Sequence, residues 1–170
     1  MSKSKKLLVI GHGRHGKDTF CEILRDYHGH KFISSSRFVG ERSVWPDWGV
    51  AYDVWDSFEQ CYADRASYRA SWAREISAYN TPDKTRTASE MLDEGYNMYC
   101  GMRQRDELEA CKDKGLFDHI IWVDRSDHCP PEPLDSMNLT KEDADFVVDN
   151  NGSMVDLWIG IYNLVQEHNL

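Results

Sequence analysis

The stretch "KKLLVIGHGRHGKDTF", residues 5–20, places a short apolar run directly before a glycine-rich turn and a lysine. The segment "KLLVIGHG" (6–13) predicts a buried strand, because four apolar residues end at a glycine break. The following residues 17–29 predict a helix, since their apolar side chains recur at helical spacing and Gly29 is a suitable stop. The stretch therefore predicts a strand, a loop and a helix in immediate succession.

Residues 11–17, "GHGRHGK", satisfy the pattern G-x-x-x-x-G-K of a phosphate-binding loop in its expected context. Glycines let backbone amides turn inward around phosphate oxygens, and the next helix adds the positive end of its dipole. Lys17 is expected to reach the β- and γ-phosphates and to neutralise charge during transfer. The nucleotide-binding residues predicted here are Gly11, His12, Gly13, Arg14, His15, Gly16, Lys17, Asp18 and Thr19.

Asp18 stands where such loops usually carry Ser or Thr, and Thr19 supplies a hydroxyl one place later. A carboxylate beside a triphosphate is repelled unless a cation lies between them. Magnesium favours carboxylates together with water and phosphate oxygens. We therefore predict that Asp18 and Thr19 take part in Mg²⁺ binding. The alternative is that Asp18 only complements the dipole of the helix.

Composition limits the class of protein. At 170 residues a single domain, 1–170, is expected. The formal net charge of −9 argues against a large nucleic-acid footprint and leaves a local basic groove open. The cysteines number five and form no CxxC pair, which favours reduced thiols in a cytoplasmic protein. The run "LLVI" is too short for a signal peptide, and nothing longer elsewhere in the sequence could span a membrane, so no membrane association is expected.

The rest of the chain alternates between strand and helix patterns, which predicts an α/β domain with a parallel sheet flanked by helices. Further strands are predicted at 96–102, 118–124 and 144–150, with helices at 103–115 and 154–169.

The segment between these units is less regular. "HKFISSS" (30–36) predicts a second short strand, and residues 37–52 are expected to be irregular because they contain Pro46 and two glycines. Residues 53–79 predict one long helix, and another helix is predicted to begin near Thr85 or Thr87.

The segment "GKDTF" (16–20) resembles the "GKDT" loop of deoxynucleoside monophosphate kinases of the bacteriophage type, within the P-loop nucleotide kinase superfamily. Residues 98–126 resemble the family's strand, arginine, helical glutamate and next strand, and 144–165 resemble its closing strand, Asn-Gly turn and helix. The resemblance implies a three-layer P-loop kinase fold that uses ATP and Mg²⁺. It also implies an acceptor-side insert at about 34–97 and a lid-like loop at about 125–143.

The resemblance implies catalytic roles for Lys17, Asp18, Arg103 and Arg125. Arg103 would point to the transferring phosphate or the acceptor, and Arg125 would clamp the donor phosphates as the lid closes. No acid stands next to Arg103, which departs from the family and strengthens the metal role of Asp18. The acceptor region also lacks the family's apolar-Pro-Leu-Lys pattern. The residues implied to flank the adenine are Asn150, Asn151 and Gly152.

Candidate acceptor residues lie in the insert. Ligands bind beyond the carboxyl ends of parallel strands, where the strand at 30–36 would place its serines. Trp45 is a candidate for stacking on a base, or for packing the insert. Arg65 and Arg69 would share one face of the predicted long helix, free for a phosphate or paired with surface acids. The substrate-binding residues predicted are Ser34, Ser35, Ser36, Trp45, Arg65, Arg69 and Arg103.

The leading function is ATP-dependent phosphoryl transfer to a deoxynucleoside monophosphate, which gives a diphosphate and ADP. One alternative keeps the kinase chemistry but phosphorylates the hydroxymethyl group of 5-hydroxymethyluracil in phage DNA, with Asp47 or Asp53 as candidate base. A second alternative is a nucleotide-binding module without turnover. The sequence leaves the acceptor and the oligomeric state open, with a homodimer as one option.

Overall fold

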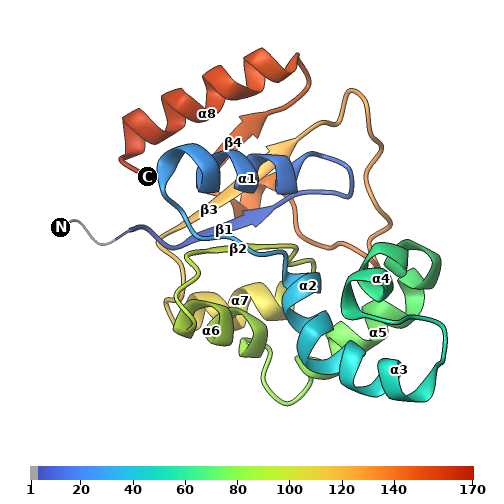
Figure 1. Cartoon of the computed structure of the whole chain (residues 1–170). Helices are drawn as coiled ribbons and strands as arrows, with labels where there is room; N and C mark the ends of the chain where they lie inside the picture. Colours follow the sequence, from blue (N-terminus) through green and yellow to red (C-terminus); the bar gives the residue numbers. More distant parts are fainter. Residues whose placement is uncertain (1–3) are drawn as a thin grey trace.

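A computed structural model describes residues 4–170 of the chain. Its centre is one sheet of parallel strands in the order β2-β1-β3-β4 (Figure 1). Their bounds are Leu7–Ile10 for β1, Met98–Cys100 for β2, His119–Asp124 for β3 and Phe146–Asp149 for β4. Phe32 makes an isolated parallel bridge to Met98, on the far side of β2 from β1. The predicted parallel sheet is confirmed.

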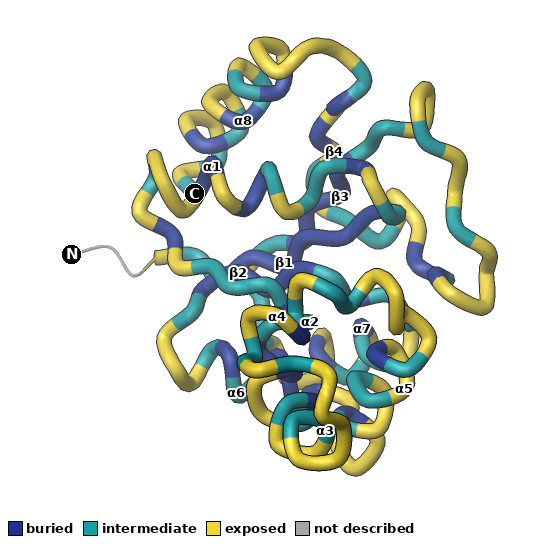
Figure 2. Tube along the Cα trace, turned by 45° about the vertical axis from the view of Figure 1, so that its right-hand side comes forward, coloured by how far each residue is buried: buried dark blue, intermediate teal, exposed yellow. Residues whose placement is uncertain are grey.

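Helices cover both faces of the sheet. Side chains alternate between the two faces along each strand, and all four residues of β1 are buried, so both faces of β1 are covered. Leu7 and Val9 of β1 pack in a core with helices α1 and α8, whereas Leu8 and Ile10 face α6 and α7. Figure 2 shows the strands as the buried centre of the molecule. The bounds are Lys17–His28 for α1, Arg86–Asp93 for α6, Arg105–Asp113 for α7 and Met154–His168 for α8.

The region 30–52 corrects two predictions. The strand expected at 30–36 is reduced to the bridge at Phe32, and Ser34 precedes helix α2 (Ser35–Val39). Residues 37–52 are not irregular, since α2 continues into a π-helical turn, η1 (Gly40–Val44), and helix α3 (Trp45–Ala51). Pro46 is the second residue of α3, directly after the π-helical turn, where the regular ladder of helical hydrogen bonds is already interrupted. The proline that suggested irregular structure is therefore compatible with a helix start.

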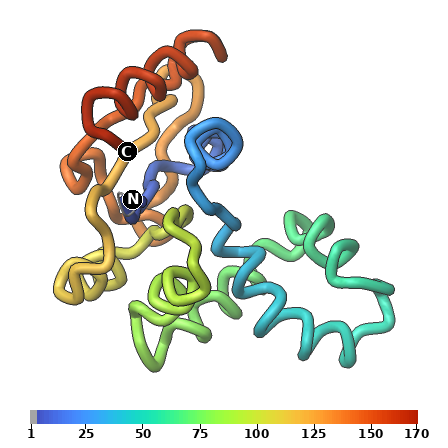
Figure 3. The backbone as a smooth tube through the Cα atoms, turned by 60° about the vertical axis from the view of Figure 1, so that its left-hand side comes forward, coloured from blue at the N-terminus to red at the C-terminus, as the bar shows by residue number. Residues whose placement is uncertain are grey.

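The single long helix expected at 53–79 is also wrong. The chain instead forms α4 (Phe58–Ala63), a 3₁₀ segment η2 (Asp64–Tyr68) and α5 (Arg69–Tyr79). Their aromatic side chains build a separate small core around Trp72, so the insert packs largely on itself. Figure 3 shows this helical region projecting to one side of the sheet.

Within residues 4–170, none of the helices has the length and apolar character needed to cross a membrane.

Candidate phosphate-binding site

The glycine loop, residues 11–16, joins β1 to α1. At Gly11 and Gly16 the surrounding atoms leave no space for a side chain. Gly16 has φ +89°, and a Cβ there would lie 2.3 Å from Nδ2 of Asn150. Gly11 has φ +145°, and a Cβ there would lie 2.6 Å from the carbonyl oxygen of Val123. Both positions therefore require glycine, and the loop amides stay close to the start of α1, where helix N–H groups are free for an anion.

Lys17 is the first residue of α1 and lies over this loop. Its Nζ donates a hydrogen bond of 2.7 Å to the carbonyl oxygen of His12. Burial lowers the pKa of Lys17, and the neighbouring Arg103 acts in the same direction, whereas Cys100, Asp18 and Glu132 oppose the shift. The lysine is thus positioned by a backbone carbonyl group.

The two histidines of the loop bind the lid-like loop. His15 is buried; its Nδ1 accepts the N–H of Arg125 at 3.1 Å, and its Nε2 lies 3.2 Å from the carbonyl oxygen of Cys129. This pair of partners assigns the proton to Nε2. His12 Nδ1 accepts the N–H of Glu132 at 3.1 Å. Residues 125–132 are therefore held against the glycine loop by hydrogen bonds between their backbone and two histidine side chains.

Glu132 reaches the glycine loop from this segment, and it was not among the predicted residues. Its Oε2 accepts the N–H of Gly13 at 2.7 Å, and its Oε1 accepts from Arg103 at 2.6 Å. The same Oε1 lies 3.3 Å from a guanidinium nitrogen of Arg69. Burial opposes ionisation, but the bonds from Arg103 and Gly13 prevail and lower the pKa of Glu132. An ionised carboxylate is thus bound by donors from the glycine loop, the β2–α7 connection and the insert.

Asp18 lies at the carboxyl end of β2. It is exposed, and its Oδ1 is 3.5 Å from Sγ of Cys100. No cluster of three or more His, Cys, Asp or Glu side chains suited to a metal occurs within 4–170. Magnesium needs only one or two carboxylates when phosphates and water complete its shell, so the exposed carboxylate of Asp18 is compatible with such an ion.

The turn 150–152, predicted near an adenine, supports the glycine loop. Asn150 is buried, and its Nδ2 donates to the carbonyl oxygen of His15 at 3.0 Å. Asn151 bonds Asp149 and accepts the N–H of Asp127. Of this turn, Asn150 directly contacts the loop, whereas Asn151 orders the start of the lid-like loop.

The predicted arginines separate into two groups. Arg69 and Arg103 converge on Glu132, as described above. Arg65 lies in η2 and not on a helix face shared with Arg69; it donates to the carbonyl oxygen of Tyr62 at 2.9 Å and stacks over that ring. Arg125 contacts the glycine loop through its backbone, since its N–H donates to Nδ1 of His15.

The predicted serines and tryptophan make contacts within the protein. Ser35 is buried and donates to the carbonyl oxygen of Cys100 at 2.7 Å. The hydroxyls of Ser34 and Ser36 are 2.8 Å apart, and that of Ser36 lies 3.4 Å from the Tyr62 hydroxyl. Trp45 packs against the small core of the insert.

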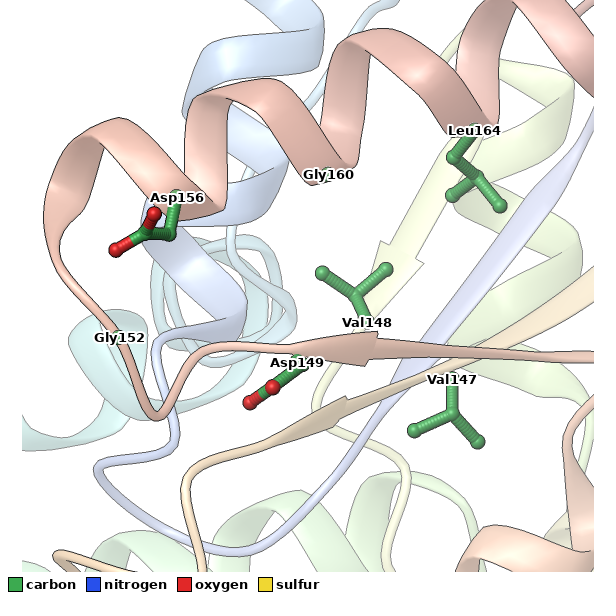
Figure 4. Close-up of a pocket in the computed structure, with 7 residues that line it drawn as sticks. All are labelled: Val147, Val148, Asp149, Gly152, Asp156, Gly160 and Leu164. Atoms are coloured by element: carbon green, nitrogen blue, oxygen red, sulfur yellow. The ribbon is translucent and has the colours of Figure 1, made fainter.

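A hollow of about 370 Å³ lies elsewhere, between β4 and α8 (Figure 4). Its lining residues are Val147, Val148, Asp149, Gly152, Asp156, Gly160 and Leu164. Because it touches the turn 150–152 only through Gly152, it is separate from the glycine loop.

Comparison with solved structures identifies the class of fold. The structure resembles shikimate kinase from Bacteroides thetaiotaomicron with a TM-score of 0.52 and 10% identity, covering 96% of this chain and 98% of that one. A protein from Thermus thermophilus matches with a TM-score of 0.45 and 16% identity, over 97% and 98% of the two chains. No protein-family model matches the sequence, and no curated protein matches it.

The chain has the three-layer α/β fold of P-loop kinases, as the sequence predicted.

Proposed function

We propose that this protein is an ATP-dependent kinase that phosphorylates a deoxynucleoside monophosphate. The observation that carries the proposal is the convergence of Gly13, Arg103 and Arg69 on the single carboxylate of Glu132. These donors come from the nucleotide loop on one side and from the acceptor side on the other. They form a preorganised anion site at the place where a phosphate would pass from donor to acceptor.

The proposed division of roles follows from this placement. Loop amides and Lys17 would bind the donor phosphates, and Asp18 with Thr19 would hold Mg²⁺, which supplies further charge neutralisation. Arg103 and Arg69 would orient the acceptor phosphate. Because such an acceptor is already an anion, positioning and positive charge supply the catalysis without a strong base.

The formal net charge of −9 favours a small nucleotide over DNA as the acceptor. Asp47 in α3 and Asp53 after it are both exposed, and neither hydrogen-bonds the glycine loop among the described residues. A hydroxyl acceptor needs a base within hydrogen-bond reach. Two other functions remain as alternatives, and the experiment below distinguishes them: phosphorylation of hydroxymethylated DNA, and nucleotide binding without turnover.

The test is a coupled assay of ADP formation with each of the common deoxynucleoside monophosphates, followed by DNA that contains 5-hydroxymethyluracil. We expect turnover with at least one monophosphate and a shallow dependence of acceptor KM on salt, since only one phosphate group is contacted. Phosphate incorporation into the DNA, with a steep salt dependence, would favour the DNA kinase. ATP binding without any turnover would favour the non-catalytic module.

A further inference from the structure

We propose that Glu132 is an internal competitor for phosphate, whose carboxylate occupies the anion site of Gly13, Arg69 and Arg103 until a nucleotide displaces it. The identity of the displacing anion rests on the proposed function. The competition itself rests on the contacts of one side chain, which come from three separate parts of the chain.

The carboxylate makes the contacts that a phosphate oxygen pair would make. Oε2 accepts a loop N–H at 2.7 Å, and Oε1 accepts from Arg103 at 2.6 Å with Arg69 at 3.3 Å. Backbone amides of a glycine loop and paired guanidinium groups are the donors that proteins use for phosphate. The Glu132 side chain is only 15% exposed, so it fills this site and does not merely lie at its rim.

Glu132 lies in a segment whose backbone conformation is restricted, and this segment faces the glycine loop. Its neighbours are Pro130, Pro131 and Pro133, whose rings fix φ and limit the conformations of the chain. Its own N–H is bound to Nδ1 of His12. Backbone and side chain of this residue are therefore both directed at the glycine loop.

Carboxylate and phosphate exclude one another at this position. The N–H of Gly13 is a single donor, and a Cβ at Gly13 would already lie 3.3 Å from the Glu132 carboxyl group. A phosphate beside the retained carboxylate would also meet like charge at short range. Nucleotide binding therefore requires the carboxylate to withdraw, and the apparent affinity is reduced by the fraction of molecules in which it has done so.

The test uses the full chain and inorganic tripolyphosphate, titrated by calorimetry without acceptor. Glu132→Gln keeps the shape of the side chain and removes its charge, so we expect tripolyphosphate to bind about tenfold more tightly. Glu132→Ala is the second variant and should change affinity in the same direction. Glu142→Gln is the matched control, because it removes the same charge from an exposed position of the same loop, away from the glycine loop. Its dissociation constant should stay within roughly twofold of the wild type.

If both Glu132 variants bind tripolyphosphate as weakly as the wild type or more weakly, while their unfolding temperatures match that of the wild type, the competition is overturned. Equal tightening in Glu142→Gln, which would indicate a general charge effect, or no tripolyphosphate binding by any form, would also overturn it. The test separates this inference from the proposed function because it needs no turnover. Tighter binding in a protein that phosphorylates no acceptor would support the competition and reject the kinase.

Discussion

The amide nitrogen of Asn150, after β4, donates a hydrogen bond of 3.0 Å to the carbonyl oxygen of His15 in the glycine loop. This bond joins the last strand of the sheet to the loop after the first strand. It also explains why the next residue is glycine, since a Cβ at Gly16 would collide with the same amide. The shape of the loop thus depends on a side chain that is far away in sequence.

Asn150→Ala should therefore affect both stability and nucleotide binding. The variant leaves the His15 carbonyl without its partner, at a cost of about 1–3 kcal/mol in the free energy of unfolding. It should also weaken ATP binding, because the loop loses a fixed point. Asn151→Ala is the control, since Asn151 bonds Asp149 and Asp127 instead. Denaturant unfolding and ATP titration measure both effects, and equal behaviour of the two variants would contradict this account.

Arg69→Ala should raise the acceptor KM on the order of tenfold to a hundredfold, because a charge-assisted contact is worth about 1.5–3 kcal/mol. The KM for ATP should change much less, since loop amides and Lys17 bind the donor. Arg74→Ala, from the same helix, is the control, because its guanidinium bonds only Ser71 in the described chain. Steady-state kinetics with both substrates varied measure these KM values. An equal rise of the acceptor KM in Arg74→Ala would contradict a specific role of Arg69.

Asp18→Asn should raise the magnesium concentration required for half-maximal rate. The carboxylate is exposed, and among residues 4–170 it forms no salt bridge and contacts the thiol of Cys100, so it is accessible to a metal ion. The asparagine keeps the shape and loses the charge that attracts the ion. An unchanged magnesium titration would leave Asp18 as a residue that only complements the dipole of α1.

His12 should make the contact between the glycine loop and Glu132 sensitive to acid. Burial, with His15 next, lowers the pKa of His12, whose neutral Nδ1 accepts the Glu132 N–H. The folded state thus binds the proton less well than the unfolded state, so this contribution to stability is complete above the unfolded pKa of about 6.5. It is lost progressively as the pH falls below that value, by at most about 1.4 kcal/mol per pH unit.

The matched variant is His12→Asn, whose Oδ1 can accept the same N–H but does not titrate. Between about pH 7.5 and pH 5.5, the unfolding temperature of the wild type should fall more steeply with decreasing pH than that of the variant. Parallel curves would show that His12 protonation does not contribute to the acid sensitivity.

The sheet and its flanking helices were predictable because their signals are local. The run at 7–10 followed by the glycine loop, the units around 98–124 and the closing segment 144–168 each combine one buried strand with one periodic helix. The insert was not predictable in the same way. Pro46 favours irregular structure in general but is tolerated at a helix start. The interruption at 64–68 places Tyr68 against Trp48 and Trp55, and such contacts between separate segments are not visible in the local pattern.

The residues of the site also differ in how far the sequence predicts them. Lys17 and the glycines follow from a motif, whereas Glu132 becomes visible only when the lid-like loop is placed over the glycine loop, 119 residues away along the chain. Its one sequence signal is a lone acid among prolines, "PPEP", which indicates a restricted segment but not its target. The roles of His12 and His15 depend on the same tertiary contact.

If the glycine loop supports phosphoryl transfer, the rate of transfer depends on Lys17, so the decisive variant is Lys17→Ala. The measurement is the initial rate of ADP formation with ATP, Mg²⁺ and the best deoxynucleoside monophosphate, for wild type and variant side by side, with thermal unfolding to establish that the variant is folded. Lys17 bonds only the His12 carbonyl in the described residues, so its loss should change charge more than packing. We predict that transfer is abolished while the variant remains folded; near-normal turnover by Lys17→Ala would contradict the kinase assignment.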